Sequence, residues 1–369
     1  MTLRRLMITA ALAPACLTSA LHAQGPERTL GAPTARLTEP FSEIAAVREL
    51  RDGRVIVLDG KEQRIVVADL ARGSVTPIGA KGRGPGEFLR ALRFIALPGD
   101  TTWVVDAQGG RVLVIGPDAT PIGVVTTFPS PASDSGISTN ALRAADGLGR
   151  LYVVKTKAPV SEGNLAPPDS TRIMRYDRAR GTVTPVGLVA LPDTKITVQR
   201  SGKEITAVDI MRTPFSVGDE WDVRASGQVV IARRAPYRLE VLALGQPPMR
   251  GPVIAASPRR VTEADKTEYL AAMPNGASVK RESVPWPDVM AVFLPRALVV
   301  TEREAWVRRS GAPDAKVAAH DVFDLQGRRI AGLSVPSEVR ILLVTARGVY
   351  VARTDEDGLQ YVERHALPR

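Results

Sequence analysis

Cysteine and histidine are scarce in this sequence. Its 369 residues include one cysteine, Cys16, and three histidines. A single cysteine excludes a disulfide framework and a zinc site with several cysteine ligands, and three histidines exclude a metal centre built mainly from imidazole. Aromatic residues make up 5% of the chain, whereas 44% of residues are hydrophobic and 24% are charged. This composition is typical of a globular protein and excludes disorder, collagen and coiled coil.

Long apolar runs are absent after the first segment. Residues 1–23 combine a basic start at Arg4 and Arg5, an apolar stretch and a small final residue, Ala23. This pattern predicts a signal peptide and a periplasmic or secreted protein. Lipid attachment at Cys16 is the alternative, although the bulky apolar residue usual three positions earlier is missing. No later run approaches the roughly 18 apolar residues of a membrane span, so we expect none.

Positive charge exceeds negative charge. Lysine and arginine number 49 against 39 for aspartate and glutamate, which gives a net charge of +10. In an exported protein this excess does not indicate nucleic-acid binding. It favours an anionic small molecule, an acidic glycan or an acidic protein segment as the partner. The alternative is that the charge only keeps the protein soluble. We expect a monomer.

One seven-residue pattern occurs six times without gaps. Each copy has a β-forming residue at its centre, and successive centres lie 47, 49, 78, 76 and 44 residues apart. The shorter intervals match a four-stranded propeller blade of about 40–50 residues. A second apolar strand and a turn follow each copy, as in an antiparallel meander. The copies are GRVIVLD ending at Asp59, DTTWVVD at Asp106, GRLYVVK at Lys155, GQVVIAR at Arg233, REAWVRR at Arg309 and RGVYVAR at Arg353.

These repeats predict an all-β fold, a six-bladed β-propeller of four-stranded antiparallel blades with one short helical insertion. The last copy ends before a fourth strand, whereas residues 34–39 precede the first blade. We therefore expect residues 34–39 to complete the last blade, which closes the ring and covers an open edge. The predicted blades are 41–79, 88–127, 139–191, 215–255, 288–335 and 337–369 with 34–39.

Two features carry a resemblance to a known family. They are the repeated second strands that begin with arginine and isoleucine or valine, and the loop Gly82-Arg83-Gly84-Pro85-Gly86-Glu87-Phe88, of the form GxGPGEF. On these features residues 34–369 resemble secreted bacterial six-bladed propellers with NHL-like repeats. The resemblance implies the fold and leaves the function open, since such propellers include binding modules, lactonases, lyases and scaffolds.

Three segments exceed the repeat length, at residues 156–170, 193–213 and 257–287. The third predicts a helix that begins near Thr262, where Asp265 follows at capping-box spacing. Connections between blades, and loops between second and third strands, leave the same face of a propeller. We therefore expect all three insertions and the Gly82–Phe88 loop on one face, which is the predicted binding face.

The last residue of each pattern copy should also lie on that face. Going round the ring, two acids are followed by four bases, and guanidinium groups suit carboxylate, phosphate or sulfate. Two alternatives are surface ion pairs for these bases and a tight blade-to-blade crossover for the glycine-rich loop. The candidate ligand-binding residues are Arg83, Glu87, Lys155, Arg233, Arg309 and Arg353.

No cofactor is expected for such a binding protein. The alternative is calcium or another divalent ion in the central channel, as in gluconolactonase-like propellers, held by Glu43, Asn140 and Asp219. We expect His320 and His365 to be ordinary strand residues, too few for a zinc lyase, and Asp355-Glu356-Asp357-Gly358 to be a turn. No nucleophile elbow occurs in the sequence.

The sequence thus predicts an exported, non-catalytic propeller that binds a ligand or a protein on a basic face decorated with loops. The rival function is a divalent-metal-dependent lactonase or hydrolase. Calcium or zinc raising the melting temperature would favour the enzyme, because a ligand of the native state stabilises it.

Overall fold

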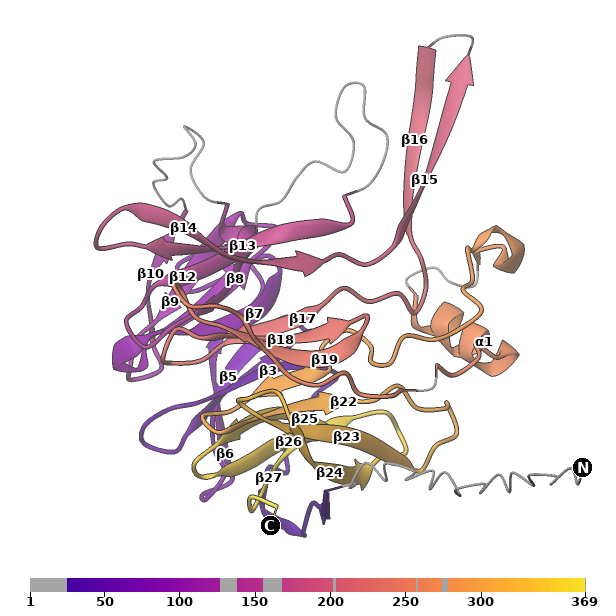
Figure 1. Ribbon diagram of the computed structural model, residues 1–369. Coiled ribbons are helices and arrows are strands. Elements are labelled where there is room, and N and C mark those ends of the chain that lie inside the picture. Colours follow the sequence, from indigo (N-terminus) through magenta and orange to yellow (C-terminus); the bar gives the residue numbers. More distant parts are fainter. Residues whose placement is uncertain are drawn as a thin grey trace, which may run out of the picture.

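The computed structural model describes residues 25–126, 138–154, 168–201, 204–256, 258–273 and 278–368. Strands predominate in these residues. Most of them form six antiparallel meanders of four strands each, which are arranged as the blades of a propeller (Figure 1). The predicted signal peptide and Cys16 lie outside the described residues.

Each blade is a meander that runs outward from an inner strand. The first three blades are β3 (Ile44–Glu49), β4 (Val55–Asp59), β5 (Arg64–Asp69) and β6 (Ser74–Gly79); β7 (Ala91–Ala96), β8 (Thr102–Asp106), β9 (Arg111–Ile115) and β10 (Pro121–Val125); and β11 (Leu142–Ala145), β12 (Leu151–Val154), β13 (Ser170–Asp177) and β14 (Thr182–Ala190).

The other three blades follow the same order. They are β17 (Glu220–Val223), β18 (Val229–Arg234), β19 (Tyr237–Leu242) and β20 (Met249–Arg250); β21 (Leu298–Val300), β22 (Glu304–Arg308), β23 (Val317–Asp324) and β24 (Arg329–Pro336); and β25 (Val339–Thr345), β26 (Gly348–Thr354), β27 (Gln360–His365) and β2 (Pro33–Arg36). Short 3-10 helices span Pro98–Asp100, Thr139–Ala141 and Arg281–Ser283.

The inner strands contact one another in a closed ring, from β3 through β7, β11, β17, β21 and β25 back to β3. The second strands, which carry the seven-residue pattern, are the most buried; every residue of β4 and β8 is buried. A short continuous apolar run is what a strand between two packed neighbours requires. Hydrophobic clusters accordingly join adjacent blades, as where Leu58 packs in one cluster with Val104 and Leu113. The predicted six-bladed fold is confirmed.

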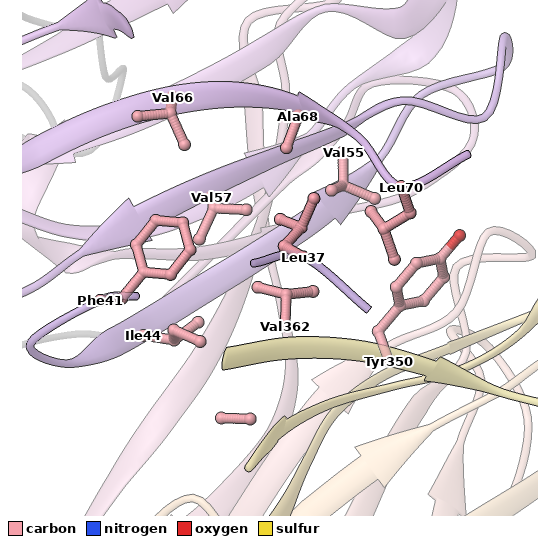
Figure 2. Packing of buried hydrophobic residues seen from close by; sticks show 11 residues of the cluster. Leu37, Phe41, Ile44, Val55, Val57, Val66, Ala68, Leu70, Tyr350 and Val362 are labelled. Carbon is pink, nitrogen blue, oxygen red and sulfur yellow. The ribbon is translucent and has the colours of Figure 1, made fainter. Parts of the chain in front are cut away.

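The amino-terminal segment completes the last blade. Strand β2 pairs antiparallel with β27, the register placing Ala35 opposite Arg364. Leu37 and Phe41, which follow β2, are fully buried in the cluster that also contains Tyr350 and Val362 (Figure 2). The predicted closure is therefore confirmed. A further strand, β1 (Glu27–Thr29), adds a parallel edge to β24, and no sequence pattern predicted it.

Two insertions form structure of their own. Between the third and fourth blades, β15 (Thr194–Ser201) and β16 (Glu204–Arg212) form a hairpin that projects away from the propeller (Figure 1). Between the fourth and fifth blades lies the predicted helix, α1 (Glu263–Ala272), which begins with a capping box between Thr262 and Asp265. Most of the insertion at 156–170 lies outside the described residues. We call the side that carries α1 and the hairpin the insert face.

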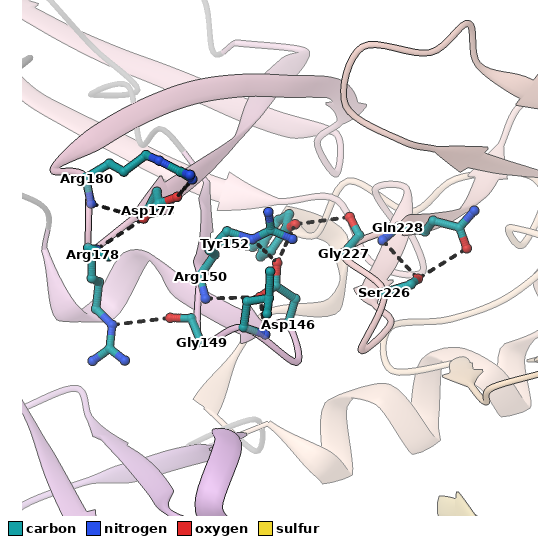
Figure 3. Close-up of polar contacts among 12 residues, drawn as sticks. Asp146, Gly149, Arg150, Tyr152, Asp177, Arg178, Arg180, Ser226, Gly227 and Gln228 are labelled. Carbon is teal, nitrogen blue, oxygen red and sulfur yellow. Dashed lines mark hydrogen bonds and ion pairs between the residues drawn. The ribbon is translucent and has the colours of Figure 1, made fainter.

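Aspartates close many of the turns. On the third blade, the Asp146 carboxylate accepts hydrogen bonds from the backbone amides of Leu148 and Arg150 and pairs with the Arg150 side chain at 2.6 Å (Figure 3). The Tyr152 hydroxyl lies 3.0 Å from the carbonyl oxygen of Gly227, which links this blade to the next. Asp355 accepts from the amides of Asp357 and Leu359, which confirms the predicted turn.

Candidate functional site

The two acids at the ends of pattern copies support the backbone. The Asp59 carboxylate accepts hydrogen bonds from the amides of Ser42, Lys61 and Glu62. Asp106 is fully buried and accepts from the amides of Leu89 and Arg90. Burial opposes ionisation of Asp106, but these backbone hydrogen bonds keep its pKa below the ordinary value. Both acids therefore fix the connection between blades.

The arginines at the equivalent positions of later blades are held in ion pairs. Arg233 lies 2.8 Å from Asp219 and 2.7 Å from Glu240. Arg353 pairs with Glu363 at 3.1 Å and with Glu338 at 2.9 Å. Lys155 lies outside the described residues. Anion binding by this arc stays a prediction, and the described arginines already have carboxylate partners.

Asp321 is the centre of another of these pairings. Only 4% of the residue is exposed, and its carboxylate accepts from Arg309 at 2.9 Å, from Arg329 at 2.7 Å and from the Tyr237 hydroxyl at 2.8 Å. Burial would raise the pKa of Asp321, but these three donors more than offset it, so the pKa stays below its ordinary value. The group joins the fourth blade to the fifth.

Replacing Asp321 with asparagine should destabilise the protein by about 3–5 kcal/mol, because two guanidinium groups lose their buried counter-ion. Urea unfolding of Asp321→Asn measures this, with the exposed Asp314 changed to asparagine as the control. A depressed carboxyl pKa contributes stability above about pH 4 that disappears as the pH falls through the folded-state pKa. The difference in unfolding free energy between Asp321→Asn and the wild type should therefore become smaller at acidic pH. Equal urea midpoints for Asp321→Asn and the wild type at pH 7 would contradict the role of Asp321 as a buried counter-ion.

The glycine-rich loop is a structural crossover. The Glu87 carboxylate folds back and accepts from the amide of Gly84 at 2.6 Å. A Cβ at Gly82 would lie 2.0 Å from the same carboxylate, so a larger residue there would push the Glu87 side chain out of this position. Phe88 is fully buried in the cluster between the first two blades. Arg83 is exposed, and ligand binding by Arg83 and Glu87 remains a prediction.

A large cavity opens on the insert face between α1 and the fifth and sixth blades. Its volume is about 910 Å³. Phe215 and Tyr269 line it, and both belong to an aromatic cluster with Trp286 that seats α1, with ring centroids 5.2 and 5.6 Å from Tyr269. Of the five predicted binding residues that the structure describes, only Arg309 lines this cavity.

Three further arginines line the cavity, Arg296, Arg308 and Arg340. Burial, the proximity of Arg296 and then that of Arg308 lower the pKa of Arg340, and Glu43 only partly opposes this. Burial alone lowers the pKa of Arg308, and no carboxylate among the described residues pairs with it. Arg296 reaches Glu43 at 3.9 Å, from a backbone with φ of 65°. Positive charge in this part of the cavity is therefore undercompensated.

Most acids of the cavity wall are already bound. Asp265 pairs with Arg259 at 2.7 Å and caps α1, and its pKa is lowered by these hydrogen bonds, that with Arg259 the strongest. Glu338 pairs with Arg353, and Asp355 closes its turn. Glu268 is exposed on α1. The inner wall of the cavity thus presents guanidinium groups to a ligand that enters it.

Sequence reasoning missed this arginine group, but a signal was present. The sixth position of the seven-residue pattern is Leu58, Val105, Val154, Ala232 and Ala352 in five copies and Arg308 in the other. A charge at a position that is otherwise apolar marks a place where packing between blades is interrupted. Arg296 and Arg340 carry no comparable signal, because both lie outside the seven-residue pattern, Arg296 before β21 and Arg340 within the inner strand β25.

The residues predicted for a channel metal have other partners. Asn140 donates to the carbonyl of Ala107, and Asp219 accepts from Arg233 and the amide of Ala190. Glu43 faces Arg296. Across the described ranges, no group of three or more histidine, cysteine, aspartate or glutamate side chains is arranged to hold a metal ion.

Comparison with known proteins shows no family for this chain. No family model matches the chain, and no curated protein matches it. A Bacteroides fragilis protein provisionally named as exported is 11% identical, with a TM-score of 0.48 over 93% of this chain and 99% of its own. A DUF4221 member from Bacteroides vulgatus is 9% identical, with a TM-score of 0.45 over 90% and 97%. A regucalcin from Agrobacterium tumefaciens is 12% identical, with a TM-score of 0.43 over 93% and 99%.

Fold and cavity together define the class of this protein. It is a six-bladed β-propeller with a cavity lined by arginines on its insert face. None of the helices in the described part of the chain combines the length and the apolar character needed to cross a membrane.

Proposed function

We propose that this protein is an exported binding protein that takes an anionic ligand in the cavity between α1 and the fifth and sixth blades. The observation that supports it is the group of Arg296, Arg308 and Arg340 on one cavity wall. Arg308 has no carboxylate partner among the described residues, and an unpaired, partly buried charge is costly to a fold. A ligand carboxylate, phosphate or sulfate would supply the missing counter-charge.

The chemistry of guanidinium suits this role. It stays charged at neutral pH and offers a planar fork of donors to two acceptor oxygens. Low solvent exposure strengthens each such contact relative to water. The aromatic side chains Phe215 and Tyr269 would cover apolar parts of the ligand.

Export follows from the leader pattern of residues 1–23. A binding protein outside the cytoplasm meets sugar acids, acidic glycans and small inorganic anions. The excess of basic residues over acidic ones would attract these anions before they reach the cavity.

Thermal unfolding in the presence of candidate ligands tests the proposal. Sulfate, phosphate, D-galacturonate and oligogalacturonate are compared with glucose at equal ionic strength. A ligand at about 100 times its Kd stabilises the native state by roughly 2.7 kcal/mol, which raises the melting temperature by several degrees. At least one anion should do so, and glucose should not. Indifference to every anion, with a rise on adding calcium or zinc, would instead favour the metal-dependent hydrolase.

A further inference from the structure

Every blade places a charged residue at the start of its inner strand. Each of these residues lies within the first three positions of the strand or at most two positions before it. Because the inner strands form a closed ring, the six residues surround one end of the propeller axis. Three of them also line the cavity, so this end lies on the insert face. We call it the axial mouth; in blade order its residues are Glu43, Arg93, Arg143, Glu220, Arg296 and Arg340.

Hydrogen bonds between neighbouring inner strands hold two of these arginines in place. Arg93 donates at 2.8 Å to the carbonyl oxygen of Leu142, the residue directly before Arg143 in β11. Arg340 donates in the same way to the carbonyl oxygen of Ile44 in β3, at 2.6 Å. A guanidinium group has several N–H donors in a planar fork. Both arginines therefore keep donors for a ligand while their positions are fixed.

Arg143 has no counter-charge in contact with it. Its side chain is exposed, and its guanidinium carbon lies 6.0 Å from the centre of the Trp221 ring. Among the described residues it makes neither a hydrogen bond nor an ion pair. Burial, and then the proximity of Arg143 and of Arg296, lowers the pKa of Arg93 to about 10. Both neighbours therefore repel the Arg93 guanidinium, and an anion bound there would offset this repulsion.

The acids of the axial mouth do not balance its arginines. Glu43 lies 3.9 Å from Arg296. Burial raises the pKa of Glu220, and the Arg296 amide and the Arg143 side chain only partly oppose this. Asp222 lies two residues further along β17 and is the next acid near Arg143. Four guanidinium groups thus face two carboxylates at the mouth and a third behind them, and none of these carboxylates pairs with Arg143.

The axial mouth and the cavity are continuous through Arg296. This exposed side chain lines the cavity, and it also lies near enough to Arg93 to lower the pKa of that residue. A ligand with a single anionic group that binds to Arg308 leaves the charge of Arg143 unmatched. A longer ligand with several anionic groups would match both.

We propose that the ligand is an oligoanion, and that it carries at least two anionic groups which bind at two successive sites. The first group binds to Arg308 and Arg340 in the cavity. The second binds to Arg93 and Arg143 at the axial mouth, beyond Arg296. Both carboxylate and phosphate groups suit guanidinium forks. This inference rests on the proposed function, and it adds a second site and the minimum number of charges on the ligand.

The first test compares anions of one and several charged groups. Galacturonate is compared with digalacturonate, and phosphate with tripolyphosphate, by titration calorimetry at equal ionic strength. In the series that binds, the longer anion should bind at least tenfold tighter than the single unit, because it makes a second set of charge-assisted hydrogen bonds. The series that binds also identifies the anionic group. Equal affinity of single unit and longer anion would overturn the inference.

The second test assigns the additional affinity to the axial mouth. In Arg143→Gln the preference for the longer anion should fall to about threefold or less, because that anion loses a contact which the single unit does not make. The melting temperature should stay close to that of the wild type, since the side chain is exposed. Arg72→Gln removes an exposed charge from the turn between β5 and β6 and should retain the full preference.

The outcomes separate this inference from the proposed function. If Arg143→Gln retains the full preference for the longer anion, the second site is not at the axial mouth, and the inference fails alone. If neither the single units nor the longer anions bind to the wild type, the proposed function fails as well.

Discussion

A chain that lacks residues 1–36 should lose at least 3 kcal/mol of unfolding free energy. The deletion removes β2 and uncovers the edge of β27. It also removes the Gly31 carbonyl that binds His365 at 2.7 Å and leaves Glu363, of which 1% is exposed, with fewer partners. Uncompensated buried polar groups of this kind cost about 1–3 kcal/mol each, and more when they are charged. Urea unfolding followed by circular dichroism measures the loss.

A chain lacking only residues 1–24 is the matched control, because none of the pairings described above involves those residues. It should unfold at the same urea concentration as the whole chain. Leu37→Ala refines the test: it leaves both strands in place but removes a fully buried side chain from the closing cluster, which costs about 2–5 kcal/mol. If the deletion unfolds no earlier than its control, the amino-terminal strand does not hold the ring closed.

The second large effect concerns the cavity. Replacing Arg308 with valine and Arg340 with glutamine should weaken binding of an anionic ligand at least a hundredfold. Charge-assisted hydrogen bonds contribute about 1.5–3 kcal/mol each, and 1.4 kcal/mol is a factor of ten. Titration calorimetry with the anion that gives the largest thermal shift measures the loss.

The thermal stability of the variants distinguishes a ligand-binding role of these arginines from a structural role. Valine is the residue at the equivalent position of the second and third blades, Val105 and Val154. The stability comparison uses Arg308→Val alone, because Arg340 also donates to the Ile44 carbonyl at 2.6 Å. Removing the Arg308 charge, which no carboxylate among the described residues pairs, should leave the melting temperature unchanged or raise it. Arg72→Gln removes an exposed charge from the turn between β5 and β6 and is the control for net charge; its affinity should match the wild type. Binding that survives the double substitution would place the ligand elsewhere.

Much of the fold followed from local patterns. The seven-residue copies could be aligned because each forms a strand packed on both faces, and such strands tolerate few residue types. Closure by residues 34–39 followed from counting, since the last blade lacked a strand. The capping box at Thr262 predicted where α1 begins. By contrast, β1 and the hairpin β15–β16 lie outside the repeat, where no periodicity applies.

The candidate site was harder to predict, because position alone does not reveal a partner. Arg233, Arg309 and Arg353 lie at equivalent places, as alignment indicates. Their carboxylate partners come from other strands and connections; Arg233, for example, pairs with Asp219 from the segment before β17. A sequence alignment therefore does not show whether an arginine is paired with a carboxylate or is free to bind a ligand.

The amino-acid sequence by itself determined the number of blades, the direction of the strands and the segment that closes the ring. These depend on hydrophobic repeats and turn residues, which act over a few neighbours along the chain. Only the tertiary structure decided which charges remain without partners. Pairing depends on distances between side chains far apart in the sequence. Arg308, for example, lines a cavity together with Arg340 of the sixth blade and Tyr269 of α1.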